Sequence, residues 1–200
     1  MRPKSMIWLI VATASVAAWY WGAAAPAKEP GVPSASSQAG IPAERVADML
    51  HAVIQADRTV YTVHVVERLQ AKGVVVASEN WQSEKTLPLP VQFMEESARL
   101  AVTTPAKVTY RLISLWPINK RNSPKGDFEQ TGLWEASQHP ERPYAGLVMN
   151  GGDLYYQAIY ADKAVSQACI GCHNAHPDSP RRDLKMNDVM GGLLIAIPIQ

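Results

Sequence analysis

The chain has 200 residues, of which 47% are hydrophobic and 18% charged, and its formal net charge is +1. This length and apolar content suit one globular domain, with or without a targeting segment. The basic residues are scattered along the chain, which argues against a general nucleic-acid binder, because such a protein needs a concentrated basic face. Two cysteines are too few for a disulfide-stabilised scaffold.

The N-terminus has the layout of a secretory signal. In residues 1–27, Arg2 and Lys4 precede an apolar run that ends in small residues. The run over residues 6–25 is also about long enough to span a bilayer, and tryptophans lie near both of its ends. We therefore expect a cleaved signal peptide or a membrane anchor. Either places the following residues in the periplasm or on the outer face of the cytoplasmic membrane.

A linker and then a long helix are expected next. Residues 28–42 are rich in Pro, Ser, Gly and Ala, which is typical of a flexible linker. Residues 43–200 are predicted to form one domain, beginning with a helix over about residues 43–71 that Gly73 can end. We expect the core-facing stripe of this helix to hold, at helical spacing, Val46, Leu50, Val53, Asp57, Val60 and His64. His51 lies off this stripe and is expected to be solvated.

Most of the predicted strands come later in the chain. Residues 144–161 contain "NGGD", a strong turn signal, and are predicted to form a β-hairpin. The other expected elements are strands at 74–77, 107–115 and 191–199 and helices at 91–102 and 128–138. Helices early and strands late favour an α+β fold with an antiparallel sheet.

Both cysteines lie in the segment "CIGCH", residues 169–173, which is the attachment motif of c-type haem. Two thiols that add across the two vinyl groups of one haem must face the same way, about one helical turn apart. The histidine after the second cysteine can then bind the iron as its proximal ligand. The sequence therefore predicts one covalent haem held by Cys169, Cys172 and His173.

Three other interpretations of this segment compete less well. A redox-active Cys-x-x-Cys pair would fit better at the start of a helix in a thioredoxin-like pattern. A structural zinc needs four ligands, and His173 beside Cys172 strains a tetrahedral site even if His176 joins them. A disulfide between the two cysteines would leave the histidine unexplained.

Three segments carry a resemblance to a known family. They are "YYQAIYADKAVSQACIGCHNAHPDSPRRDLKMNDVMGGLLIAIPI" (155–199), "YRLISLWPINKRNSP" (110–124) and "ADRTVYTVHVVERL" (56–69). In these the chain resembles the c-type haem proteins with a PAS-like fold. The resemblance implies a PAS-like antiparallel sheet with N-terminal helices, one covalent haem, and a role in redox sensing or electron transfer.

The sixth ligand of the iron is not given by the motif. A member of the resembled family uses a cysteine thiolate there, and this chain has no third cysteine. His64 is the first candidate, because it lies 18 residues, or about five helical turns, beyond Val46. A core histidine bonded to a backbone carbonyl is the plainer interpretation. An open site is a further possibility, and the competing methionines are Met94, Met186 and Met190.

Other residues are candidates for contact with the haem. Arg58 and Tyr61 lie near His64 on the long helix and can line the pocket, and Trp116 can pack against the macrocycle, as can Pro117 and Tyr144. Arg181, with Arg182 and Lys185, can pair with the propionates or dock an acidic partner, although interspersed aspartates also suit a solvated loop.

Three functions fit these observations. The first is an exported monohaem c-type cytochrome that transfers electrons to or from a redox partner protein. The second is a haem-based sensor of redox state or of a diatomic gas that acts through a separate partner. The third, a haem enzyme such as a peroxidase, needs distal acid and base groups that the sequence does not identify, so we do not expect an enzyme.

Overall fold

The predicted N-terminal helix is one continuous helical segment from Ala43 to Ala71. A computed structural model describes residues 40–199, so the expected signal or anchor, residues 1–27, lies outside the described residues. The segment consists of α1 (Ala43–Val60), the π-helical η1 (Tyr61–Glu67) and α2 (Arg68–Ala71). It ends as expected at Gly73, whose φ of 65° is left-handed. Among residues 40–199, no helix combines the length and apolarity needed to cross a membrane.

The later elements follow the expected order with one shortened strand. The strand expected over residues 74–77 is reduced to the two-residue β1, because its pairing with β2 covers only two positions, beginning with Ala77 opposite Leu87. The elements are β1 (Ala77–Ser78), β2 (Leu87–Pro88), α3 (Pro90–Ala101), β3 (Thr109–Ile113), η2 (Lys120–Asn122), α4 (Asp127–Gln138), β4 (Tyr144–Asn150), β5 (Asp153–Lys163), α5 (Gln167–Ala175) and β6 (Val189–Pro198).

Four strands form one antiparallel sheet in the order β3-β6-β5-β4. The predicted hairpin is β4 and β5, and its turn residues Gly151 and Gly152 have φ values of 62° and 93°. Positive φ at both central residues matches the right-handed twist of the paired strands, and glycine adopts it without steric cost. The expected α+β fold with an antiparallel sheet is therefore confirmed.

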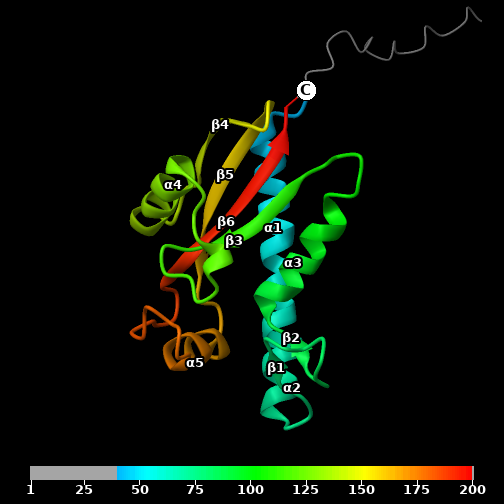
Figure 1. Cartoon of the computed structure of the whole chain (residues 1–200), viewed down its shortest axis with the longest axis vertical. Helices are drawn as coiled ribbons and strands as arrows, with labels where there is room; N and C mark the ends of the chain where they lie inside the picture. The colour runs from blue at the N-terminus through cyan, green and yellow to red at the C-terminus, as the bar shows by residue number, and fades with distance from the viewer. Residues whose placement is uncertain (1–39, 200) are drawn as a thin grey trace, which may run out of the picture. The chain divides into compact units, whose positions relative to one another are not determined.

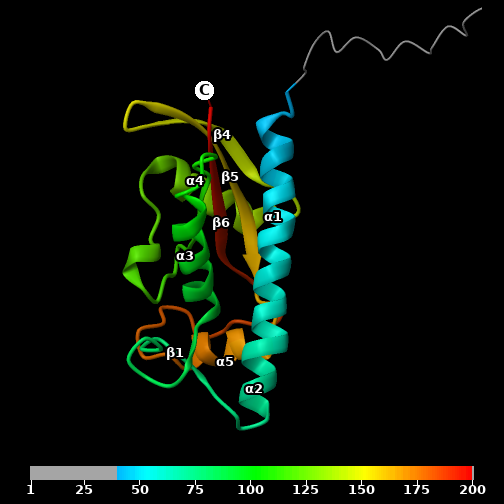
Figure 2. The same ribbon diagram turned by 90° about the vertical axis from the view of Figure 1, so that its right-hand side faces the viewer.

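Helices pack on both faces of this sheet (Figures 1 and 2). Side chains alternate along β5, so that Ala158 and Tyr160 join α1 and α3 in one core cluster, whereas Ile159 joins α4 in another. The strand β6 alternates in the same way, with Ile195 in the first cluster and Leu194 in the second. The sheet is thus buried on both sides, and its central strands supply residues to both cores.

The face of α1 that packs on the sheet matches the predicted stripe only in part. Leu50 of that stripe packs against the core, whereas Val53 and Val60 are 60% and 54% exposed, and His64 is also exposed. The buried residues of the helix include Ala47 and Arg58. Beyond Leu50 the prediction failed because an arginine was not expected on the buried face, whereas Arg58 is buried there and its charge is compensated by Asp162.

His51 is part of this packed face, which corrects the expectation that it is solvated. Its ring stacks on that of Tyr160, with centroids 4.0 Å apart and planes at 7°. The hydroxyl of Tyr160 donates a hydrogen bond of 2.8 Å to Asp48 Oδ1 on the same helix. Burial lowers the pKa of His51, and the carboxylates of Asp48 and Asp162 offset this only in part.

Two glycines let β6 pass close to its neighbours. A Cβ added at Gly191 would overlap the carbonyl oxygen of Ile113, a backbone atom of β3. One added at Gly192 would lie 2.7 Å from Ile159 Cγ2. These contacts set how closely β6 approaches β3 and β5 at the end of the sheet from which α5 departs.

Gly191→Ala is therefore expected to lower the free energy of unfolding by about 1–3 kcal/mol, the usual cost of overpacking. Gly171→Ala on α5 is the matched control, because an added Cβ there has no neighbour within 4 Å. It should leave stability unchanged or raise it by up to about 1 kcal/mol, since alanine favours a helix. Urea unfolding measures both. Equal effects would show that the contact with Ile113 does not constrain β6.

His51 should make stability depend on pH. Because its pKa is lowered by folding, the unfolded chain binds the proton more readily, so the free energy of unfolding rises with pH just below the ordinary imidazole pKa of about 6.5. The contribution is present above that pH and is lost as the pH falls through the folded pKa. His51→Phe, which retains the stacking, should flatten this slope in unfolding measured across the interval. His64→Gln, at an exposed position, should leave the slope unchanged. An unchanged slope in His51→Phe would contradict the assignment of the pH dependence to His51.

Candidate functional site

The Cys-x-x-Cys-His segment lies on α5, a nine-residue helix between β5 and β6. Ser166 caps its first turn, and the Ser166 hydroxyl oxygen accepts a hydrogen bond of 3.0 Å from the backbone N–H of Ala168. Cys169 is partly buried and Cys172 is exposed, and both are free thiols. Three residues apart on a helix, they are neighbours on one face, as attachment to a single group requires.

A cavity of about 730 Å³ lies against this helix. This volume falls within the range of about 300–1,000 Å³ that is usual for sites of small molecules and cofactors. Its walls come from α5, the long helical segment, the start of α3, and the end of β3 with the loop that follows. The lining residues used below are Arg58, Thr62, Val66, Gln70, Glu79, Leu89, Leu112, Ile113, Trp116, Pro117, Arg121, Asp162, Cys169, Cys172, His173, His176 and Met190.

The long helical segment contributes one row of side chains to the cavity. Arg58, Thr62, Val66 and Gln70 follow one another at intervals of four residues. In an α-helix of 3.6 residues per turn such a row drifts around the axis. The π-helical η1 has wider turns, so a mixture of π- and α-turns brings the average toward four residues and keeps the row in line. The π-segment therefore shapes this wall.

A buried ion pair joins this wall to the sheet. The Arg58 guanidinium donates through Nη1 to Asp162 Oδ1, near the end of β5, and both side chains are almost completely buried. The Thr62 hydroxyl donates a hydrogen bond of 2.7 Å to the backbone carbonyl of Arg58. The Nε atom of Arg58 is buried and has no hydrogen-bond partner among the described residues. Both charged residues also line the cavity.

The imidazole of His173 is held in its neutral form. Burial lowers its pKa; Asp162 opposes this, and the charges of Arg58 and His176 lower the pKa further. A neutral imidazole has a free lone pair and is the form that binds metals. The His173 side chain is therefore prepared to act as a ligand at ordinary pH.

The thiol of Cys172 has the opposite character from that of a redox-active cysteine. Although Cys172 is exposed at the surface, partial desolvation of its thiol raises the pKa, and the charges of Glu79 and Cys169 raise it further. Catalytic dithiols have lowered thiol pKa values, because the thiolate is the reactive species. This environment disfavours the redox interpretation of the pair. In the described part of the chain, no group of three or more His, Cys, Asp or Glu residues is arranged to hold a metal ion, so the zinc interpretation gains no support.

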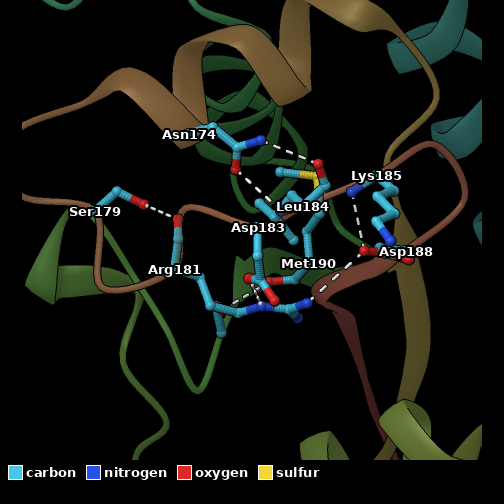
Figure 3. A network of polar contacts seen from close by, with 9 residues as sticks. Asn174, Ser179, Arg181, Asp183, Leu184, Lys185, Asp188 and Met190 are labelled. Atoms are coloured by element: carbon cyan, nitrogen blue, oxygen red, sulfur yellow. Dashed lines mark hydrogen bonds and ion pairs between the residues drawn. The ribbon is translucent and has the colours of Figure 1, made fainter.

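Trp116 lines the cavity, and Arg181 lies over its ring. The Arg181 guanidinium carbon is 4.9 Å from the centroid of the Trp116 ring. Arg181 Nε donates a hydrogen bond of 3.0 Å to Asp183, and its Nη2 is 3.7 Å from Asp188 (Figure 3). Arg181 thus holds the loop after α5 against the cavity wall and is not itself a lining residue.

The same loop is fixed to α5 by a paired contact. The side-chain amide of Asn174 donates to the carbonyl of Leu184, and the N–H of Leu184 donates back to Asn174 Oδ1, each at 3.0 Å (Figure 3). The Ser179 hydroxyl donates to the backbone carbonyl of Arg181, and the backbone N–H of Lys185 donates to Asp188 Oδ2. The helix with the two cysteines is therefore braced by the chain that follows it.

Two predicted site residues lie away from the cavity. Tyr61 stacks on Phe93 with ring centroids 4.4 Å apart, and its hydroxyl donates to the carbonyl of Pro88 at 2.8 Å. His64 is exposed and does not line the cavity. The structure therefore brings together Arg58, Trp116 and the three motif residues, but not Tyr61 or His64.

Of the remaining candidates for contact with the haem, some line the cavity and others do not. Pro117 and Met190 line the cavity, whereas Met94 is buried in the core and Met186 is partly exposed. Tyr144 packs against Phe128 beside α4, with ring centroids 5.0 Å apart. Of the three methionines weighed as ligands, only Met190 therefore lies at the cavity.

Thr62 and Asp162 are site residues that the sequence analysis did not identify. Asp162 lies near the end of β5, seven residues before Cys169, and a carboxylate at the end of a buried strand is a signal that could have identified it. Thr62 carries no such signal, because its place in the wall depends on the register of η1.

The combined residues fit a covalently attached haem. Two neighbouring free thiols and a neutral imidazole form the donor set, and apolar side chains such as Leu112 and Ile113 line the space beside them. The buried Arg58 Nε nearby has no hydrogen-bond partner among the described residues. All of these groups face one cavity of suitable volume.

Comparison with known proteins shows to which family the chain is related. Residues 36–198 match the family described as "Tll0287-like: Tll0287". No curated protein matches the chain. The crystal structure of the cyanobacterial heme-protein Tll0287 is similar with a TM-score of 0.47 and 18% identity, covering 80% of this chain and 99% of that one. The predicted relationship to haem proteins is confirmed at the level of the family: the chain belongs to the Tll0287-like family.

Proposed function

We propose that the domain carries one haem c, attached through Cys169 and Cys172, with His173 as the proximal iron ligand. The observation that carries this proposal is that all three residues line one cavity of about 730 Å³. Membership of a family named after Tll0287, itself a heme-protein, supports it. The four-stranded antiparallel sheet with helices on both faces supports the PAS-like classification.

The protein's own residues would prepare the site for redox chemistry. When bound, the haem iron supplies a centre that takes up and releases single electrons. His173, whose lowered pKa favours the neutral imidazole, would offer its lone pair to that centre, and the apolar side chains of Leu112, Ile113 and Met190 would pack beside it. Cys172 is exposed, so the attached edge would lie near the surface, where a partner protein can approach it.

On this basis we infer an exported monohaem c-type cytochrome that acts in electron transfer with a redox partner protein. It would work in the periplasm or on the outer face of the membrane, soluble after signal cleavage or anchored by residues 6–25. The layout of residues 1–27 supports export. We assign a carrier and not an enzyme, and no nucleic-acid partner, because the near-neutral composition favours none.

A haem-based sensor is the second candidate, and one observation favours it. The row that the long helical segment presents to the cavity is Arg58, Thr62, Val66 and Gln70. None of these is a residue type that usually ligates haem iron. A wall without such a ligand suits a site that takes a small exogenous molecule, as a gas sensor does. A change in the cavity would then be passed to a separate partner.

Replacing both attachment cysteines together tests the central proposal. After expression with cytochrome c maturation machinery, the wild-type chain should carry the mass of one haem through denaturation and give a pyridine haemochrome spectrum. Cys169→Ala with Cys172→Ala should lose nearly all covalent haem, because both thioether bonds are removed. His64→Ala should retain it, since His64 lies away from the cavity. A wild-type protein without covalent haem would refute the proposal.

Carbon monoxide distinguishes the two functional candidates. A carrier whose iron has two firm protein ligands should give a low-spin reduced spectrum that carbon monoxide leaves unchanged. His64→Ala should not alter this result, because His64 lies away from the cavity. A shift on addition of carbon monoxide would instead favour sensing, because the row on the long helical segment lacks a usual iron ligand. Met190→Leu then tests the methionine that lines the cavity among the described residues.

A further inference from the structure

The ion pair between Arg58 and Asp162 shares the wall of the cavity with His173. The two charged side chains are only 6% and 9% exposed. Apolar side chains of similar volume often stabilise a fold as well as a buried ion pair does, because the pair must be removed from water. The stability of the fold alone therefore does not account for two charges at this position. Their place at the cavity indicates a role toward the group that the cavity holds.

The position of the negative charge is fixed by the sheet. Asp162 lies on the central strand β5 opposite Gly191 of β6, and the register of the two strands shifts between Asp162 and Lys163. Irregularities of this kind are frequent next to active sites, where they redirect a side chain. Arg58 Nη1 donates to the same carboxylate from the long helix. The two charges thus have fixed places, and fixed charges act on a neighbouring group without reorganisation.

Both charges act on the imidazole of His173. Burial has the largest influence on its pKa and lowers it; Asp162 raises the pKa, and Arg58 and then His176 lower it. The influence of Asp162 is thus larger than that of Arg58, although the two oppose each other. A charge that acts on the proximal imidazole also acts on an iron held by that imidazole, because electrostatic interactions are only weakly screened in a buried site.

We propose that this ion pair sets the reduction potential of the haem, with Asp162 lowering the potential and Arg58 opposing that effect. The inference rests on the proposed haem attachment and on His173 as the proximal ligand. The ferric state has one more positive charge than the ferrous state, so a nearby negative charge stabilises the ferric state. Burial and outer-shell groups are among the means by which a protein tunes a haem. Neither residue of the pair binds the iron.

Asp162→Asn tests the negative charge in the full, haem-loaded chain by spectroelectrochemical titration. Asparagine has nearly the size of aspartate, and its side-chain oxygen still accepts from Arg58. At a given applied potential the ratio of ferrous to ferric protein should rise about tenfold or more, a positive shift of about 59 mV or more for one electron. Adding Arg58→Gln to this variant removes the opposing charge and should return the potential most of the way to the wild-type value.

A second ion pair in the same domain provides the matched control. Arg111 on β3 pairs with Glu129 on α4, and the Glu129 side chain is 10% exposed, close to the value for Asp162. Neither residue of this second pair is among the described residues that line the cavity. Glu129→Gln should therefore leave the potential unchanged, although it also neutralises a buried carboxylate of an ion pair.

A further variant keeps the test decisive if Asp162→Asn does not fold. Arg58→Met with Asp162→Leu replaces the pair by apolar side chains, a change that buried ion pairs often tolerate. Because both charges are lost together, the ratio of ferrous to ferric protein in this variant should differ from that of the wild type by less than about tenfold.

The possible results are distinct from those that test haem attachment. Loading is measured first for each variant by mass and by the pyridine haemochrome, and a wild-type protein without haem overturns the proposed function itself. With haem attached, the inference is overturned if Asp162→Asn leaves the potential unchanged or lowers it. It is also overturned if the double amide variant keeps the raised potential, if Glu129→Gln gives an equal shift, or if the apolar double variant shifts the ratio tenfold or more.

Discussion

The buried ion pair between Arg58 and Asp162 determines how the long helix lies on the sheet. Removing two charges from water is costly unless they meet each other in good geometry. Once Arg58 is inside, the helix can be rotated only slightly about its axis before the guanidinium loses the carboxylate. The pair therefore selects the face of α1 that is buried, and with it the row of side chains that lines the cavity.

The wall of the cavity that α5 forms is held in position by the sheet. Both β5 and β6 run through the centre of the sheet, and α5 is the connection between them. Gly191 and Gly192 let β6 lie close to β3 and β5 where this connection begins and ends. The loop after α5 is closed by Asn174, Arg181 and their partners. Two rigid supports thus hold the cysteine helix at a fixed place beside the cavity, which suits a group that is attached at two points.

Most of the helices, strands and turns were predicted, because residues close together in the sequence encode them. Contacts between residues far apart in the sequence could not be predicted from it. The glycine pair of the hairpin and the end of the long helix at Gly73 are encoded within a few residues, and the structure has both. The buried face of α1 depends on a partner 104 residues away from Arg58, which no periodicity of apolar residues can reveal. The placement of His64 failed for this reason, whereas the cysteine motif could be recognised because it lies within five consecutive residues.

The π-helical segment has a consequence for comparing this chain with its relatives. Over residues 61–67 the helix accommodates more residues per turn than an α-helix does. A relative whose corresponding helix is α-helical throughout would present an equivalent wall with fewer residues. An alignment that allows no gap in this helix would then pair Thr62 or Val66 with a residue on another side of the relative's helix. Correspondence of residues along this helix is therefore best judged from superposed structures, with a one-residue insertion permitted near Tyr61.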